Sequence, residues 1–98
     1  MPMLRLLGTG TAAGGFAALY DTDADLLVVQ GASTRDGTAV LVPTELLDSV
    51  EPGTTLLAET TTAAGVALVA GTPVDDETRE KLLLEPNETA VEVPKNGQ

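Results

Sequence analysis

The sequence predicts a small α+β domain that is mainly β, with one or two short helices. Three features of its 98 residues indicate this class. Short runs rich in Val, Leu and Thr are separated by Gly and Pro, which favours strands joined by turns. Only one segment carries clear helix start and stop signals. Finally, 43% of the residues are hydrophobic but only 2% are aromatic, so the core of this single domain must be aliphatic.

The first fifteen residues differ in composition from the rest of the chain. They begin with the apolar stretch Met1–Leu7 and continue with four glycines separated by Thr and Ala. Because glycine raises the entropy of the unfolded chain and Thr-Gly-Thr has no helical face, we expect a flexible or irregular extended arm over residues 1–15. The glycines also suggest a phosphate-binding loop, but the strand before it and the helix after it are both missing.

Two short β-rich runs follow this arm. They are Leu26–Gln30 and Thr38–Val42, and the segment between them ends in Asp36-Gly37, a common turn signal. We therefore expect neighbouring strands joined by a hairpin or a loop. Pro43 closes the second run.

The middle of the chain predicts a helical turn and two more strands. Residues Thr44–Val50 could form about one helical turn before Pro52-Gly53 stops it. The segments Thr54–Glu59 and Gly65–Ala70 then have strand character. The second of these is almost wholly apolar, so we expect it to be buried on both faces.

The clearest helix signal begins at Asp75, a plausible N-cap residue. Asp76 and Glu77 place negative charge at the positive end of the helix dipole, and Glu77 and Lys81 are spaced for an i, i+4 pair. The apolar run Leu82–Leu84 continues the pattern until Pro86 ends it.

The last predicted strand is Thr89–Val93, in which polar and apolar residues alternate, and residues 94–98 form a polar tail. The expected organisation is therefore an arm over residues 1–15, a single domain over residues 16–93 and the tail.

The charge and the missing residue types exclude several functions. Fifteen acidic residues against five basic ones give a net charge of -10, which opposes binding to nucleic acid or to anionic membranes. No segment approaches the roughly 20 apolar residues of a membrane span, and the apolar start is too short for a signal peptide, so we expect a soluble protein that is not exported. The absence of Cys and His removes thiol chemistry and the usual general base, and we expect no enzyme and no cofactor.

Three alternating carboxylates, Asp21, Asp23 and Asp25, have the spacing with which calcium-binding loops begin. However, Leu26 stands at the sixth position, where the loop needs Gly, and Ala32 stands at the twelfth, where it needs Glu. A solvated acidic turn is therefore favoured over a cation site, and no bound metal is expected.

From Asp36 to Val93, the order of the segments resembles the lambda-type head decoration proteins of tailed viruses. The matching segments are DGTAVLV, TTLLAE, GVALVAGTP, DDETREKLLL and TAVEV. A looser likeness extends over Leu19–Ala32. None of these motifs is catalytic.

The resemblance implies a β-tulip or barrel-like domain that assembles as a homotrimer on the outer surface of the capsid, after synthesis in the host cytoplasm. It also implies that the N-terminal arm contacts the major capsid protein. The residues of the arm that would bind the capsid are Met3, Leu4, Arg5, Leu6, Leu7 and Gly8.

The favoured hypothesis is thus a decoration protein that reinforces a viral head against the pressure of packaged DNA. The surplus of acid also resembles proteins of salt-loving organisms, although an acidic surface can simply keep a small apolar domain soluble. A non-viral acidic trimeric adaptor is the alternative. A third hypothesis, a divalent-cation hydrolase, would use Asp21, Asp23 and Asp25.

Overall fold

The computed structural model describes residues 4–12, 15–22, 26–34, 38–49, 55–56, 60–63, 66–82 and 88–96. Their elements in chain order are β1 (Arg5–Ala12), β2 (Gly15–Asp21), β3 (Leu26–Thr34), β4 (Ala39–Pro43), the 3-10 helix η2 (Thr44–Ser49), β5 (Thr55–Leu56), β6 (Thr60–Ala63), β7 (Val66–Ala70), β8 (Thr72–Pro73), α1 (Asp76–Lys81) and β9 (Glu88–Asn96).

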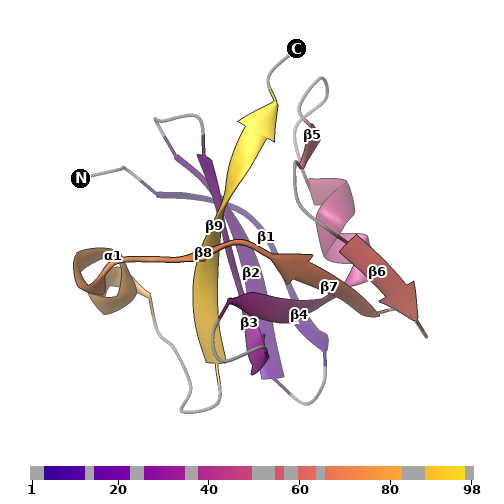
Figure 1. Cartoon of the computed structure of the whole chain (residues 1–98). Helices are drawn as coiled ribbons and strands as arrows, with labels where there is room; N and C mark the ends of the chain where they lie inside the picture. Colours follow the sequence, from indigo (N-terminus) through magenta and orange to yellow (C-terminus); the bar gives the residue numbers. More distant parts are fainter. Residues whose placement is uncertain are drawn as a thin grey trace.

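The strands form an antiparallel sheet in the order β1-β2-β3-β4-β7-β6 (Figure 1). The last strand, β9, crosses back through the fold and pairs with β3, β5 and β8. With only the short helices α1 and η2 in the part of the chain that the structure describes, this confirms the predicted mainly β α+β class.

The main core lies on the inner face of this sheet. Its side chains come from β2, β3, β4, η2, β7 and β9, where inward-facing residues alternate with outward-facing ones. Among the described residues only Ala, Val and Leu take part, which agrees with the aliphatic core that the composition predicts. The buried members are Ala17, Leu19, Leu27, Val29, Val40, Val42, Leu46, Ala67, Val69, Val91 and Val93.

A second, smaller apolar cluster covers the opposite face of β3 and β9. There, Val28 and Ala90 pack with Val74 and Leu82, which flank α1. The strands β3 and β9 are therefore buried on both faces. This two-sided burial explains why Leu26–Val29 is continuously apolar instead of alternating.

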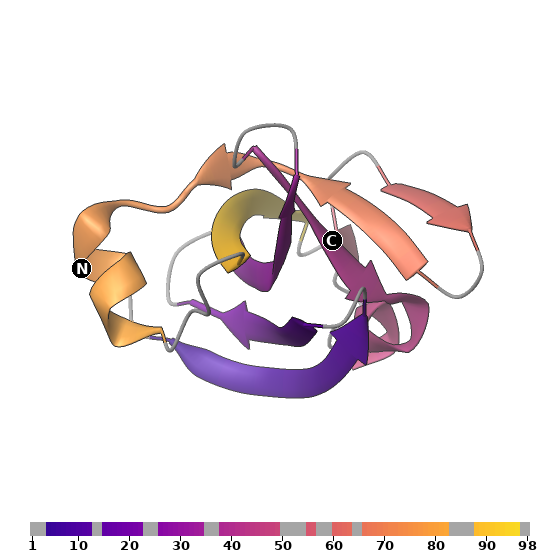
Figure 2. The ribbon, with the colours of Figure 1, turned by 90° about the horizontal axis from the view of Figure 1, so that it is seen from below.

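The sheet curls until its first strand meets the end of the fourth. A Cβ atom added to Gly10 of β1 would lie 2.7 Å from Cγ of Pro43, the last residue of β4. Figure 2 shows the resulting barrel-like arrangement, with β1 along one side of the molecule and β7 and β8 along the other. Leu46 of η2 is buried in the main core and helps to close this end.

The predicted helix start is confirmed. The Asp75 side chain caps α1 by accepting a hydrogen bond from the Thr78 backbone N–H at 2.8 Å. Hydrogen bonds from the Thr78 side chain and backbone hold the pKa of Asp75 below its ordinary value of 3.8. The helix ends at Lys81, earlier than the apolar run suggested, because Leu82 turns to an extended conformation and its side chain enters the second cluster. Residues 83–87 lie outside the described part of the chain.

The expectation of a flexible or irregular arm over residues 1–15 is corrected for residues 5–12. These residues form β1 and pair with β2 from one end of the strand to the other. Gly10, which suggested mobility, is instead needed where the strand passes close to Pro43, because a side chain has no room there. Residues 1–3 and 13–14 lie outside the described part of the chain.

The expected polar tail also belongs partly to the sheet, because β9 continues through Asn96 and its last residues pair with β5. Residues 97–98 are not described. Of the strand predicted over Thr54–Glu59, the structure describes only the two residues of β5.

The expectation that β7 is buried on both faces was wrong. Ala67 and Val69 are buried, whereas the residues that alternate with them are half-exposed.

Gly31 of β3 gives a test of how closely the strands pack. A Cβ atom at this buried position would collide with the backbone carbonyl oxygen of Leu41, which cannot move without disturbing β4. We expect Gly31→Ala to lower the free energy of unfolding by about 1–3 kcal/mol. The control is Ser33→Ala on the same strand, where the side chain is exposed and the expected change is within about 0.5 kcal/mol. Chemical denaturation measures the free energy of unfolding of both variants. Equal values for Gly31→Ala and Ser33→Ala would contradict the close packing at Gly31.

Candidate docking surface

Five of the six N-terminal residues that the sequence singled out, Leu4–Gly8, lie at or within β1, but they do not share one face. Leu4 is half-buried against the second cluster, and Leu7 is half-buried against the main core. In contrast, Leu6 is 55% exposed. Of the six predicted residues, Met3 alone lies outside the described part of the chain.

The alternation of a strand places Leu6 and Leu7 on opposite faces, and a bulge follows directly at Leu7. Leu6 lies opposite Tyr20, but Gly8 lies opposite Leu19, so Leu7 is an extra residue in β1. The extra residue shifts the alternation beyond it. As a result, Gly8 and not a larger residue lies opposite the core residue Leu19.

The structure adds Phe16 and Tyr20, which the sequence reasoning missed. Phe16 is 42% exposed, and with Leu6 it makes up the exposed large hydrophobic residues of the described chain. Phe16 and Tyr20 are four residues apart on β2 and therefore share a face, which Leu6 also shares because it lies opposite Tyr20. We call this outer side of β1 and β2, with Leu6, Thr9, Phe16 and Tyr20, the hairpin face.

The hairpin face is formed by the part of the sequence that has no acidic residues. Residues 1–20 contain Arg5 as their single charged side chain, whereas all fifteen acidic residues stand at Asp21 or later. This uneven distribution is visible in the sequence and is the signal that could have extended the predicted site to Phe16.

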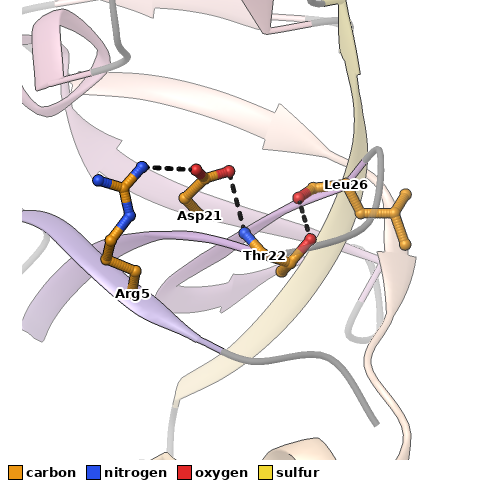
Figure 3. A network of polar contacts seen from close by, with 4 residues as sticks. All are labelled: Arg5, Asp21, Thr22 and Leu26. Carbon is orange, nitrogen blue, oxygen red and sulfur yellow. Dashed lines mark hydrogen bonds and ion pairs between the residues drawn. The ribbon is translucent and has the colours of Figure 1, made fainter.

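Arg5 attaches the start of β1 to the end of β2 (Figure 3). Its Nη2 donates to Oδ2 of Asp21, the residue opposite it in the sheet, at 2.7 Å. The other carboxylate oxygen of Asp21 accepts from the Thr22 backbone N–H at 3.0 Å, and the Thr22 hydroxyl donates to the Leu26 carbonyl oxygen at 2.6 Å. These contacts order the start of the turn between β2 and β3.

The same contacts bear on the cation site that the sequence suggested. Asp21 uses its carboxylate for Arg5 and Thr22, and Asp23 and Asp25 lie outside the described residues. Within the described ranges, no group of three or more acidic residues is placed to hold a metal ion. Of these three carboxylates the structure describes Asp21 alone, so the hydrolase hypothesis stays a prediction.

The outer strand β1 ends the sheet on one side. In the described structure it pairs with β2 alone, and its eight residues make it longer than β6, the four-residue strand at the other end. The outer strand of a sheet presents backbone N–H and C=O groups that another chain can pair with. Together with Leu6, this makes β1 and the hairpin face the candidate docking surface.

Comparison with known proteins adds no relative: no family model, curated protein or solved structure matches this chain. Among the described helices, none is long and apolar enough to cross a membrane.

The ion pair predicts a measurable contribution to stability. Arg5→Gln removes the cation from Asp21, whose side chain is only 12% exposed, and we expect the free energy of unfolding to fall by about 1 kcal/mol. The loss should shrink in concentrated salt, because 60% of the Arg5 side chain is exposed and the attraction is screened.

Lys81→Gln is the matched control, since it removes one positive charge from an exposed position at the end of α1. It changes the net charge equally but should alter the free energy of unfolding by less than about 0.5 kcal/mol. Equal losses for both variants in chemical denaturation would show that net charge, and not the contact with Asp21, matters.

Tyr20, the only tyrosine, reports on burial at the end of the hairpin face that packs against the second cluster. Burial raises the pKa of its phenol above the ordinary value of 10.0. Because the folded state favours the neutral phenol, this contribution to stability is present below pH 10 and is lost as the pH rises through the folded pKa. Ultraviolet absorbance should show tyrosinate forming at higher pH in the folded protein than in denaturant; coincident titrations would contradict the burial.

Proposed function

We propose that this protein is a capsid decoration protein of a tailed virus. It binds as a homotrimer to the outer surface of the shell of major capsid protein and reinforces the head against the pressure of packaged DNA. The observation that carries the proposal is the docking surface: an outer strand with an exposed leucine, on a small acidic domain, at the chain end where the resemblance implies contact with the capsid.

The position of β1 supports a docking role in a revised form. The first strand is part of the sheet instead of a free arm, so it offers a partner an already ordered outer strand. A partner that adds a strand gains main-chain hydrogen bonds, and exposed side chains such as Leu6 give specificity. Order before binding also reduces the entropy that docking costs.

The charge distribution supports a fixed orientation on the shell. The hairpin face itself carries no acidic residue, so the protein can contact the capsid through a surface that brings no negative charge of its own. Packaged DNA repels a strongly acidic protein, which favours the outer surface of the shell over the inner one. A ligand that binds only the assembled shell stabilises it by mass action, so many copies can reinforce the head without catalysis.

The alternative is a non-viral acidic trimeric adaptor that binds a cellular protein through the same surface. The geometry of the hairpin face suits both functions. Gene neighbourhood separates them, because genes for a portal, a protease and a major capsid protein beside this one favour the viral function.

A shell-binding experiment tests the proposal. Purified protein is mixed with expanded, undecorated shells of the major capsid protein from the same virus, in low and in molar salt, and bound protein is measured by co-sedimentation. We expect saturable binding by the natural chain. Leu6→Asp should weaken it about tenfold or more, because a charge replaces an apolar side chain at the contact.

Thr72→Asp is the matched control. Thr72 is exposed on β8, in the same row of residues as Leu6 but four strands away along the sheet. It adds the same charge and should leave binding unchanged. If the natural chain binds the shells neither in low salt nor in molar salt, the decoration function is rejected. If Leu6→Asp binds like Thr72→Asp, the hairpin face is not the contact.

A further inference from the structure

We propose that, in the free protein, the β1 strands of two copies pair with each other in antiparallel orientation and join their sheets across a two-fold axis. This self-association is separate from the decoration function and does not depend on it. It follows from three properties of β1 and the hairpin face: an open strand, exposed apolar side chains and the absence of acid.

The first property is that β1 lacks most of the features by which proteins protect outer strands. Such strands are usually short, or carry lysines, prolines or inward-pointing charges. Within its eight residues β1 has no lysine or proline, and its single charge, on Arg5, is paired with Asp21. The bulge at Leu7 interrupts only the first half, which leaves Gly8–Ala12 in regular register. In the part of the chain that the structure describes, no strand other than β2 is hydrogen-bonded to this half of β1.

The second property is the apolar surface beside this strand. Leu6 lies on β1 itself, and Phe16 lies on β2 beside the second half of β1. Two copies that join β1 to β1 bring both hairpin faces into one continuous surface. Leu6 and Phe16 of each copy then lie near the new junction, where part of their exposed area is removed from water.

The third property selects a second copy as the occupant. Each copy carries a net charge of -10, so most approaches between copies are repulsive. The hairpin face itself brings no acid to the contact, because residues 1–20 contain none. A two-fold axis places this same surface on both sides of the contact, and identical strands pair in antiparallel orientation about such an axis. The strand at the other end of the sheet, β6, has only four residues.

Sedimentation velocity of the full chain over a concentration series tests the pairing. We expect a monomer–dimer equilibrium, with a dissociation constant that falls in molar salt because the repulsion between the acidic bodies is then screened. A chain that stays monomeric up to the highest soluble concentration, in both low and molar salt, overturns the proposal.

Variants at Thr9 locate the contact. Thr9 is exposed and lies in the regular half of β1. When two β1 strands pair in antiparallel orientation, the Thr9 residues of the two copies come close to each other. Thr9→Asp alone and Thr9→Lys alone should each raise the dissociation constant about fivefold or more, because like charges meet across the new strand pair. An equimolar mixture of the two should recover a dimer, since the charges are then opposite.

Thr72→Asp again serves as the control and should dimerise like the natural chain. Failure of the mixture to recover dimers, or an equal loss in Thr72→Asp, overturns the pairing through β1. A trimer that Thr9→Asp leaves intact also overturns it, but it agrees with the trimer of the proposed function. The shell-binding experiment has its own readout, so either proposal can fail while the other stands.

Discussion

The rest of the fold depends on the pairing of β3 with β9, two strands that are buried on both faces. Val29 and Val91 lie opposite each other in the main core, whereas Val28 and Ala90 face the second cluster. Strands buried in this way need cover on both sides. The curled sheet supplies it on one side and the segment around α1 on the other, which is why a domain this small needs its helix. Because β3 also pairs with β2, the same strand positions the hairpin that carries the candidate docking surface.

A core without large aromatic side chains requires the backbones to approach closely. Such contacts join residues that are close in space but far apart in the sequence. A sequence therefore predicts the features with local signals and not the features that depend on these contacts. The strand over Leu26–Gln30 and the cap at Asp75 could be predicted because their signals lie within a few residues. The role of Gly10 could not, because the reason for a glycine there is Pro43, more than thirty residues away. A glycine needed for close packing cannot be distinguished in the sequence from one that makes the chain mobile.

The candidate site was predictable to a similar extent. The apolar N-terminal residues pointed to β1, but the sequence alone does not show that Leu7 faces the main core and that Leu6 is left exposed. Phe16 was missed because β2 reads as apolar on both faces, and only the curl of the sheet decides which side is covered. The absence of acid before Asp21, by contrast, could be read directly from the sequence and marks the same surface.

The open side of β1 can pair with only one strand at a time. If it serves both a second copy and a capsid shell, the two partners compete, and the shell captures only the protein whose β1 is unpaired. The apparent affinity for the shell then falls as the protein concentration rises, although no contact with the shell has changed. Under the two proposals, salt strengthens self-association by screening the acidic bodies, and it acts in the same direction on neighbouring copies on a shell. Together, the proposals imply that decoration is favoured when the shell offers many sites at once and free protein is dilute enough to be monomeric.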